Sequence, residues 1–117
     1  MPSFSDIVPA LTELAIELPS WAFGNSGTRF RVCPQQGVPR DPFEKIEDAA
    51  QVHKFTGLAP SVALHIPWDK VESFQNLKAR AESLGVSLGT INSNTFQDEA
   101  YMLGSLCHHD KTVRKQA

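Results

Sequence analysis

The 117-residue sequence has little of what marks several classes of protein. Eleven Lys and Arg against thirteen Asp and Glu give a formal net charge of −2, so the chain lacks the basic excess that binds nucleic acid or anionic membranes. No apolar run approaches the roughly 20 residues of a membrane span, and the first residues carry acids where a secretion signal carries basic residues. Two cysteines, Cys33 and Cys107, form neither a zinc-ligand spacing nor a disulfide framework. We therefore expect a cytoplasmic protein with neither nucleic acid nor a membrane as partner.

What the sequence does contain is an alternation of helix and strand patterns. Apolar residues at helical spacing predict helices over 5–18, 42–56 and 71–84, which end at Pro19, Gly57 and Gly85. Short apolar runs predict strands over 20–23, 61–67 and 86–91. Asp41 is placed to cap the helix over 42–56, with Pro42 at its first position and Glu44 completing a capping box. Asp110 is placed to begin a last helix over 111–117.

This order predicts the α/β fold class, with about three parallel strands and helices between them. Three strands are too few for a closed barrel, which takes about 250 residues. We therefore expect residues 1–117 to be the incomplete N-terminal portion of one larger domain.

One long segment interrupts the alternation. Residues 24–41 hold three glycines and two prolines before Asp41 and show almost no periodicity. Loops of this length inside a domain are often lids or binding loops, so Phe30 is a candidate binding residue.

The strand ends carry the residues with the most chemistry, because ligands of α/β proteins bind at the carboxyl ends of the strands. His65 ends an apolar strand, where it can transfer protons or can be a core histidine bonded to the backbone. Trp68 can form a flat wall against a sugar ring or can cover the core. Asp69, with Glu72 three residues later, fits the N-cap of the helix that follows.

For the other polar residues, the sequence gives weaker evidence of a functional role. Asn92 and Asn94 can bind a polyol through their amides, although Asn is also a common turn residue. His108 and His109 precede Asp110, but no third ligand has matching spacing, which favours a solvated loop and helix cap over a metal site. His53 lies on the apolar side of its helix, which indicates a half-buried packing role.

Four runs along the chain are together characteristic. They are 21–30 (WAFGNSGTRF), 43–50 (FEKIEDAA), 62–69 (VALHIPWD) and 91–98 (INSNTFQD). In order and spacing the sequence from Trp21 to Ala117 resembles the N-terminal third of bacterial L-rhamnose isomerase-type sugar isomerases, closest to their broad-specificity branch. These enzymes are xylose isomerase-like (β/α)8 TIM barrels.

The resemblance implies an aldose–ketose isomerase for L-rhamnose and related sugars such as L-mannose, L-lyxose and D-allose. It assigns ring opening to His65 and the wall of the sugar pocket to Trp68 and Trp21. It also assigns to Phe30 the cover over a neighbouring subunit's active site, in a homotetramer. Asn92 is taken as a further substrate-binding residue at the third strand end.

The same resemblance implies divalent metal ions, commonly manganese, as cofactors. The family's metal ligands lie on later strands, beyond Ala117, so we expect no metal ligand in this chain and no activity from the chain alone. Two alternatives remain open at this point. One is a noncatalytic (β/α) assembly fragment, and the other is a sugar epimerase or isomerase of the same barrel superfamily.

Overall fold

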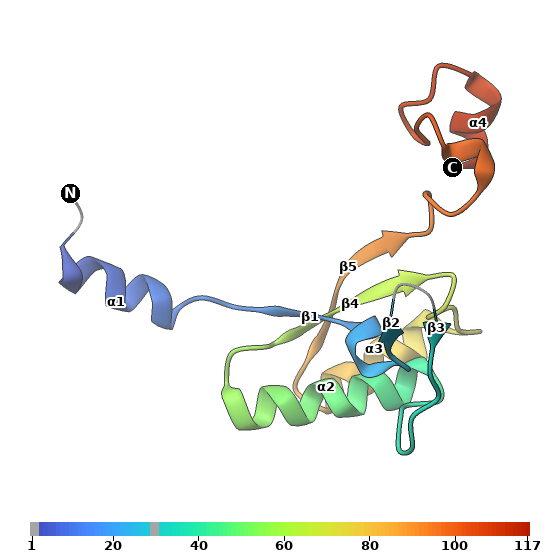
Figure 1. The fold of residues 1–117 in the computed structure, drawn as a ribbon. Coiled ribbons are helices and arrows are strands. Elements are labelled where there is room, and N and C mark those ends of the chain that lie inside the picture. Colours follow the sequence, from blue (N-terminus) through green and yellow to red (C-terminus); the bar gives the residue numbers. More distant parts are fainter. Residues whose placement is uncertain (1–2, 29–30) are drawn as a thin grey trace.

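The computed structural model describes residues 3–28 and 31–117 and has a parallel sheet at its centre (Figure 1). Strands β1 (Glu17–Pro19), β4 (Ser61–Ile66) and β5 (Ser87–Ser93) form the three-stranded sheet, in the order β1-β4-β5. Both pairs are parallel, with Leu18 beside Val62 and Val62 beside Leu88. The predicted α/β class is therefore confirmed.

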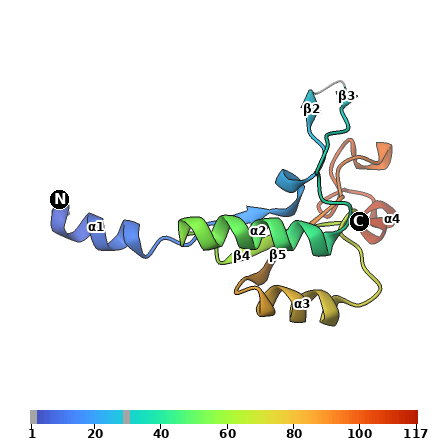
Figure 2. The same ribbon diagram turned by 90° about the horizontal axis from the view of Figure 1, so that it is seen from below.

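Two helices cover one face of this sheet (Figures 1 and 2). Helix α2 (Pro42–Thr56) lies between β1 and β4 along the chain, and α3 (Phe74–Ser83) lies between β4 and β5. The core between helices and sheet consists of Ile46, Ala49, Ala50, Val62, Leu64, Leu77, Ala81 and Val86. Helices on one face of a parallel sheet are what part of a barrel wall looks like, with the helices outside.

The helix signals of the sequence are largely confirmed. Asp41 caps α2 by accepting a hydrogen bond from the Glu44 amide at 3.0 Å, and Gly57 ends the helix with a φ of 71°. The Glu44 carboxylate does not complete the expected capping box with Asp41, because it accepts from the Arg40 amide instead, at 2.7 Å. Asp110 caps α4 (Lys111–Gln116), accepting from the Thr112 amide at 2.7 Å.

The first predicted helix is too long, and the first predicted strand is misplaced. Helix α1 (Phe4–Thr12) ends early, because Glu17–Pro19 pairs with Ser61–Ala63 as β1 and Leu18 packs against the core. Residues Ser20–Phe23 form a 3-10 helix, η1, instead of a strand. Helical spacing of apolar residues was outweighed here by strand pairing across the fold, which a local pattern does not contain.

The segment 24–41 is mostly loop, as predicted, but it includes a small hairpin. Strands β2 (Gly27–Thr28) and β3 (Arg31–Val32) pair antiparallel. A side chain at Gly27 would collide with the backbone of Arg31, so this close approach requires glycine. Phe30 lies outside the described residues.

The third strand and its surroundings are confirmed with shifted bounds. Strand β5 covers 87–93 where 86–91 was predicted, and a short 3-10 helix, η2 (Glu99–Tyr101), follows it. Ser73, not Asp69, caps α3, by accepting from the Asn76 amide at 3.2 Å. The Asp69 carboxylate instead accepts hydrogen bonds from Ser20, Lys45 and the His65 amide.

Helix α1 stands away from the sheet (Figure 1), and its apolar side chains are exposed. No helix in the described part of the chain has both the length and the apolar character needed to cross a membrane.

Candidate functional site at the strand ends

An aromatic cluster surrounds His65 at the carboxyl end of the sheet. The His65 ring centre lies 4.3 Å from that of Trp68, 5.2 Å from that of Trp21 and 6.3 Å from that of Phe96. Trp21 comes from η1, His65 from the end of β4, Trp68 from the turn after β4, and Phe96 from the segment after β5. Three strand ends thus contribute to one cluster, which joins the predicted residues Trp21, His65 and Trp68.

The cluster borders a cavity of ≈ 240 Å³. Its lining residues are Trp21, Gly24, Asn25, Lys45, His65, Trp68 and Gln97. Trp21 and Trp68 are 47% and 49% exposed, so each indole still offers surface to a ligand. Ligand pockets usually measure about 300–1,000 Å³, so the part of the cavity that this chain forms lies just below the usual size.

Asp69 lies directly beneath this cluster, with 0% of its surface exposed. Its carboxylate accepts hydrogen bonds from the Lys45 ammonium at 2.6 Å, from the His65 backbone amide at 2.7 Å and from the Ser20 hydroxyl. Burial alone raises the pKa of Asp69, but these three hydrogen bonds and the Lys45 charge outweigh it and lower the pKa below 3.8. The carboxylate is therefore ionised at neutral pH, and both of its oxygens accept hydrogen bonds within the chain.

The predicted role of Asp69 as a helix cap is thus wrong. An Asp followed three residues later by Glu72 has the pattern of a capping box, but the helix begins one turn later, at Ser73. The sequence does not show that Lys45, 24 residues away, approaches this carboxylate.

Lys45, Phe96 and Gln97 were missed as site residues. Lys45 follows the cap of a helix whose other inward residues are apolar, and a lysine between Glu44 and Ile46 gives no sign of burial. Phe96 offered the better signal, because it is an aromatic residue in the polar run that follows a strand.

The two asparagines of that run have different surroundings. Asn92 is exposed on β5 and pairs in register with His65. The Asn94 amide donates to the Ile66 carbonyl at 2.9 Å, and its side chain donates to Gln97 at 3.0 Å. Asn94 thereby connects the ends of β4 and β5 and supports a residue that lines the cavity.

The remaining histidines lie away from the cavity. The buried His108 accepts from the Asp110 amide at 3.0 Å, while Arg114 donates to the carbonyls of His108 and His109 at 2.6 and 2.8 Å. His53 is half-buried on α2, as predicted. Among residues 3–28 and 31–117, no three His, Cys, Asp or Glu side chains gather as metal ligands do. A manganese ion therefore has no ligand set among the described residues.

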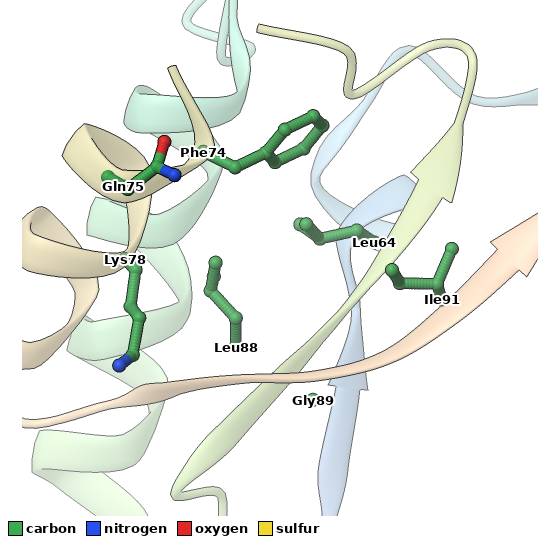
Figure 3. Close-up of a pocket in the computed structure, with 7 residues that line it drawn as sticks. All are labelled: Leu64, Phe74, Gln75, Lys78, Leu88, Gly89 and Ile91. Carbon is green, nitrogen blue, oxygen red and sulfur yellow. The ribbon is translucent and has the colours of Figure 1, made fainter.

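A second cavity, of ≈ 300 Å³, lies between α3 and the sheet (Figure 3). Its lining residues are Leu64, Phe74, Gln75, Lys78, Leu88, Gly89 and Ile91. This apolar hollow lies on the helix-covered side of β5, and the aromatic cluster contributes nothing to it.

The fold and the cluster define a class of protein: an α/β protein with a candidate ligand site at the carboxyl ends of parallel strands. Comparison with known proteins narrows the class. The chain is similar to a probable sugar isomerase of Rhizobium meliloti (strain 1021), with 45% identity over 107 residues that cover 87% of this chain and 25% of that protein. It is similar to a probable sugar isomerase of Mesorhizobium japonicum, with 44% identity over 118 positions that cover 96% of this chain and 27% of that protein.

The chain thus spans about a quarter of the length of the curated relatives it matches. No family model matches it.

Proposed function

We propose that this chain is the N-terminal part of a sugar isomerase barrel, and that its strand-end cavity binds the sugar and opens its ring. The observation that carries the proposal is the His65 imidazole, which lies between Trp21 and Trp68 at the cavity. The similarity to two proteins named as probable sugar isomerases supports it.

The cavity offers both kinds of surface that a sugar needs. The C–H faces of a sugar ring pack against flat aromatic surfaces, which the half-exposed indoles of Trp21 and Trp68 provide. Hydroxyl groups need donors and acceptors, and Lys45, Asn25 and Gln97 line the same cavity. The Lys45 ammonium gives one of its three N–H bonds to Asp69, which leaves two for a ligand.

His65 supplies proton transfer. In ring opening, the anomeric hydroxyl loses its proton, the bond between the anomeric carbon and the ring oxygen breaks, and the ring oxygen gains a proton. A neutral imidazole accepts the first proton, and the imidazolium donates it to the ring oxygen, so the histidine is regenerated. The product is the open-chain aldose that an aldose–ketose isomerase requires.

The finer assignments rest on the motif resemblance described above. We propose L-rhamnose and related aldoses as substrates, manganese bound by strands beyond Ala117, and a cytoplasmic homotetramer in which Phe30 covers a neighbouring site. In this proposal the 117-residue chain alone is inactive, because the hydrogen shift between the first two carbons needs groups that it does not supply.

The test is His65→Asn in the complete enzyme that contains this chain, with His109→Asn as the matched control. His109 is exposed and lies outside the cavity. We expect His65→Asn to lower turnover of ring-closed L-rhamnose about 10²- to 10⁴-fold, the range of general acid–base catalysis, with bound metal unchanged. The control keeps wild-type kinetics.

Three results would contradict the proposal. Equal kinetics of the two variants would remove His65 from the chemistry, and a matching loss of metal would make it a metal ligand instead. Inversion at one carbon of the sugar, without ketose formation, would identify an epimerase.

A further inference from the structure

The Asp69 carboxylate connects three of the elements around the aromatic cluster. Its donors come from three different elements: Ser20 from η1, Lys45 from α2 and the His65 amide from β4. The Asp69 amide also donates to the His65 carbonyl, at 2.8 Å. Asp69 therefore bonds to the backbone of His65 through both its side chain and its main chain.

Each of these donors is a site residue or its direct neighbour. Ser20 precedes Trp21, and Asp69 itself follows Trp68. Lys45 lines the cavity, and His65 carries the imidazole. The Asp69 carboxylate thus pairs with the Lys45 ammonium and accepts from the His65 backbone. Ser20 and Asp69, which are direct neighbours of the two tryptophans, form a further hydrogen bond with each other.

Stability alone does not explain this arrangement. Burying an ion pair gains little over packing apolar side chains of the same volume, because both charges lose their hydration. Helix capping does not explain it either, because Ser73 caps α3. What the buried charge does provide is a fixed geometry at three neighbouring positions of the site.

We propose that Asp69 is the positioning residue of this site, which holds Trp21, His65 and Lys45 in place without contacting the ligand. The ligand's identity rests on the proposed function, whereas the positioning itself does not. The same hydrogen bonds order the cluster whether or not a sugar binds there.

The experiment uses near-UV circular dichroism of the 117-residue chain. The chain has only two tryptophans, Trp21 and Trp68, and both belong to the cluster, so the tryptophan band reports on the site alone. The test variant is Asp69→Asn, which removes the charge at nearly constant volume. The matched control is Glu47→Gln, which removes the carboxylate of another ion pair, 2.6 Å from Arg80, between α2 and α3.

We expect Asp69→Asn to lose most of the tryptophan band while far-UV circular dichroism keeps the helix and strand content. Glu47→Gln keeps both signals. A tryptophan band in Asp69→Asn equal to that of the wild type would overturn the proposal.

A second variant covers the case in which Asp69→Asn unfolds because the Lys45 charge is left unpaired. Asp69→Asn with Lys45→Met removes both charges, so the far-UV signal returns and the tryptophan band stays lost. Recovery of both signals would show that only charge balance matters, and loss of both would show that Asp69 holds the whole fold. Either result contradicts a role in positioning the site.

Titration of the same samples with L-rhamnose separates this proposal from the proposed function. A wild-type chain that fails to bind the sugar counts against the proposed function alone, provided that Asp69→Asn still loses its band. A wild-type chain that binds the sugar, with an unchanged band in Asp69→Asn, counts against the positioning role alone.

Discussion

Two of the cavities in the described part of the chain are similar in size and differ in almost every other respect. The strand-end cavity measures ≈ 240 Å³ and the apolar hollow ≈ 300 Å³. The first is lined by two indoles, an imidazole, an ammonium and two amides, whereas the second is lined by aliphatic and aromatic carbon apart from Gln75 and Lys78 (Figure 3). Size therefore does not distinguish these two cavities, and the convergence of polar groups does.

The residues behind the two cavities differ as well. A buried carboxylate supports the strand-end cavity, and its hydrogen bonds come from elements far apart in the sequence. Behind the apolar hollow lie Leu64 and Leu88, and Ile91 at its border is 66% exposed on the edge strand β5. The hollow is a gap in packing at the edge of the sheet, while the strand-end cavity has an ordered polar support.

The largest expected difference between the two cavities is the effect of removing their lysines. Lys45→Met leaves the buried Asp69 charge without its cation, and breaking a buried pair in this way costs about 3–5 kcal/mol. Lys78→Met at the hollow removes an exposed cation paired with Glu82 and changes the free energy of unfolding by no more than about 0.5 kcal/mol. Urea denaturation of the two variants measures both values. Equal losses would mean that the Asp69–Lys45 pair gives no special support.

The next test lowers the stability of the chain while leaving its sugar affinity unchanged. Leu64 is buried and lines the hollow, so Leu64→Ala lowers the free energy of unfolding by about 2–5 kcal/mol through lost burial and the space left behind. At a temperature where the variant is folded, its affinity for L-rhamnose stays that of the wild type, as fluorescence titration would show. Weaker binding by the folded variant would mean that the hollow takes part in recognition.

The smallest expected effect is the pH dependence that Asp69 adds to folding. Its pKa in the folded chain lies below the ordinary value of 3.8, so the folded state favours the ionised carboxylate. The resulting stabilisation is complete above 3.8 and is lost as the pH falls through the lower pKa of the folded state. Urea denaturation at a series of acidic pH values should therefore show a shallower loss in Asp69→Asn than in the wild type. Identical slopes would indicate that the carboxylate is not ionised when buried.

The sequence predicts the elements of this fold better than it predicts the support of the site. The 61–67 and 86–91 runs and the caps at Asp41 and Asp110 are local signals, and each corresponds to an element of the structure. The sequence predicts a helix over 5–18 that overlaps the strand at 17–19, because the partner of this strand lies 44 residues further along the chain, and pairing of that kind leaves no periodicity in so short a run.

The residues of the site likewise divide into those that the sequence predicts and those that it does not. The strand ends predict His65 and Trp68 as candidate residues and the resemblance predicts Trp21, and the structure brings the three rings together. Their roles in binding stay predictions. The sequence does not predict the ion pair between Lys45 and Asp69, because a buried ion pair between a helix and a turn looks in sequence like a surface lysine and a helix cap. The roles of Phe30 and Asn92 in binding stay predictions.

The most direct measurement is a titration of the 117-residue chain with L-rhamnose, followed by tryptophan fluorescence. Both tryptophans lie in the aromatic cluster, so a sugar that packs against them must change their emission. We predict a saturable change that Trp68→Ala weakens about two- to tenfold in affinity, in line with about 0.5–1.5 kcal/mol for aromatic packing. Phe74→Ala at the apolar hollow leaves it unchanged. A wild-type emission that does not respond to the sugar, or a response that Trp68→Ala leaves intact, would contradict the assignment of the strand-end cavity as a sugar site.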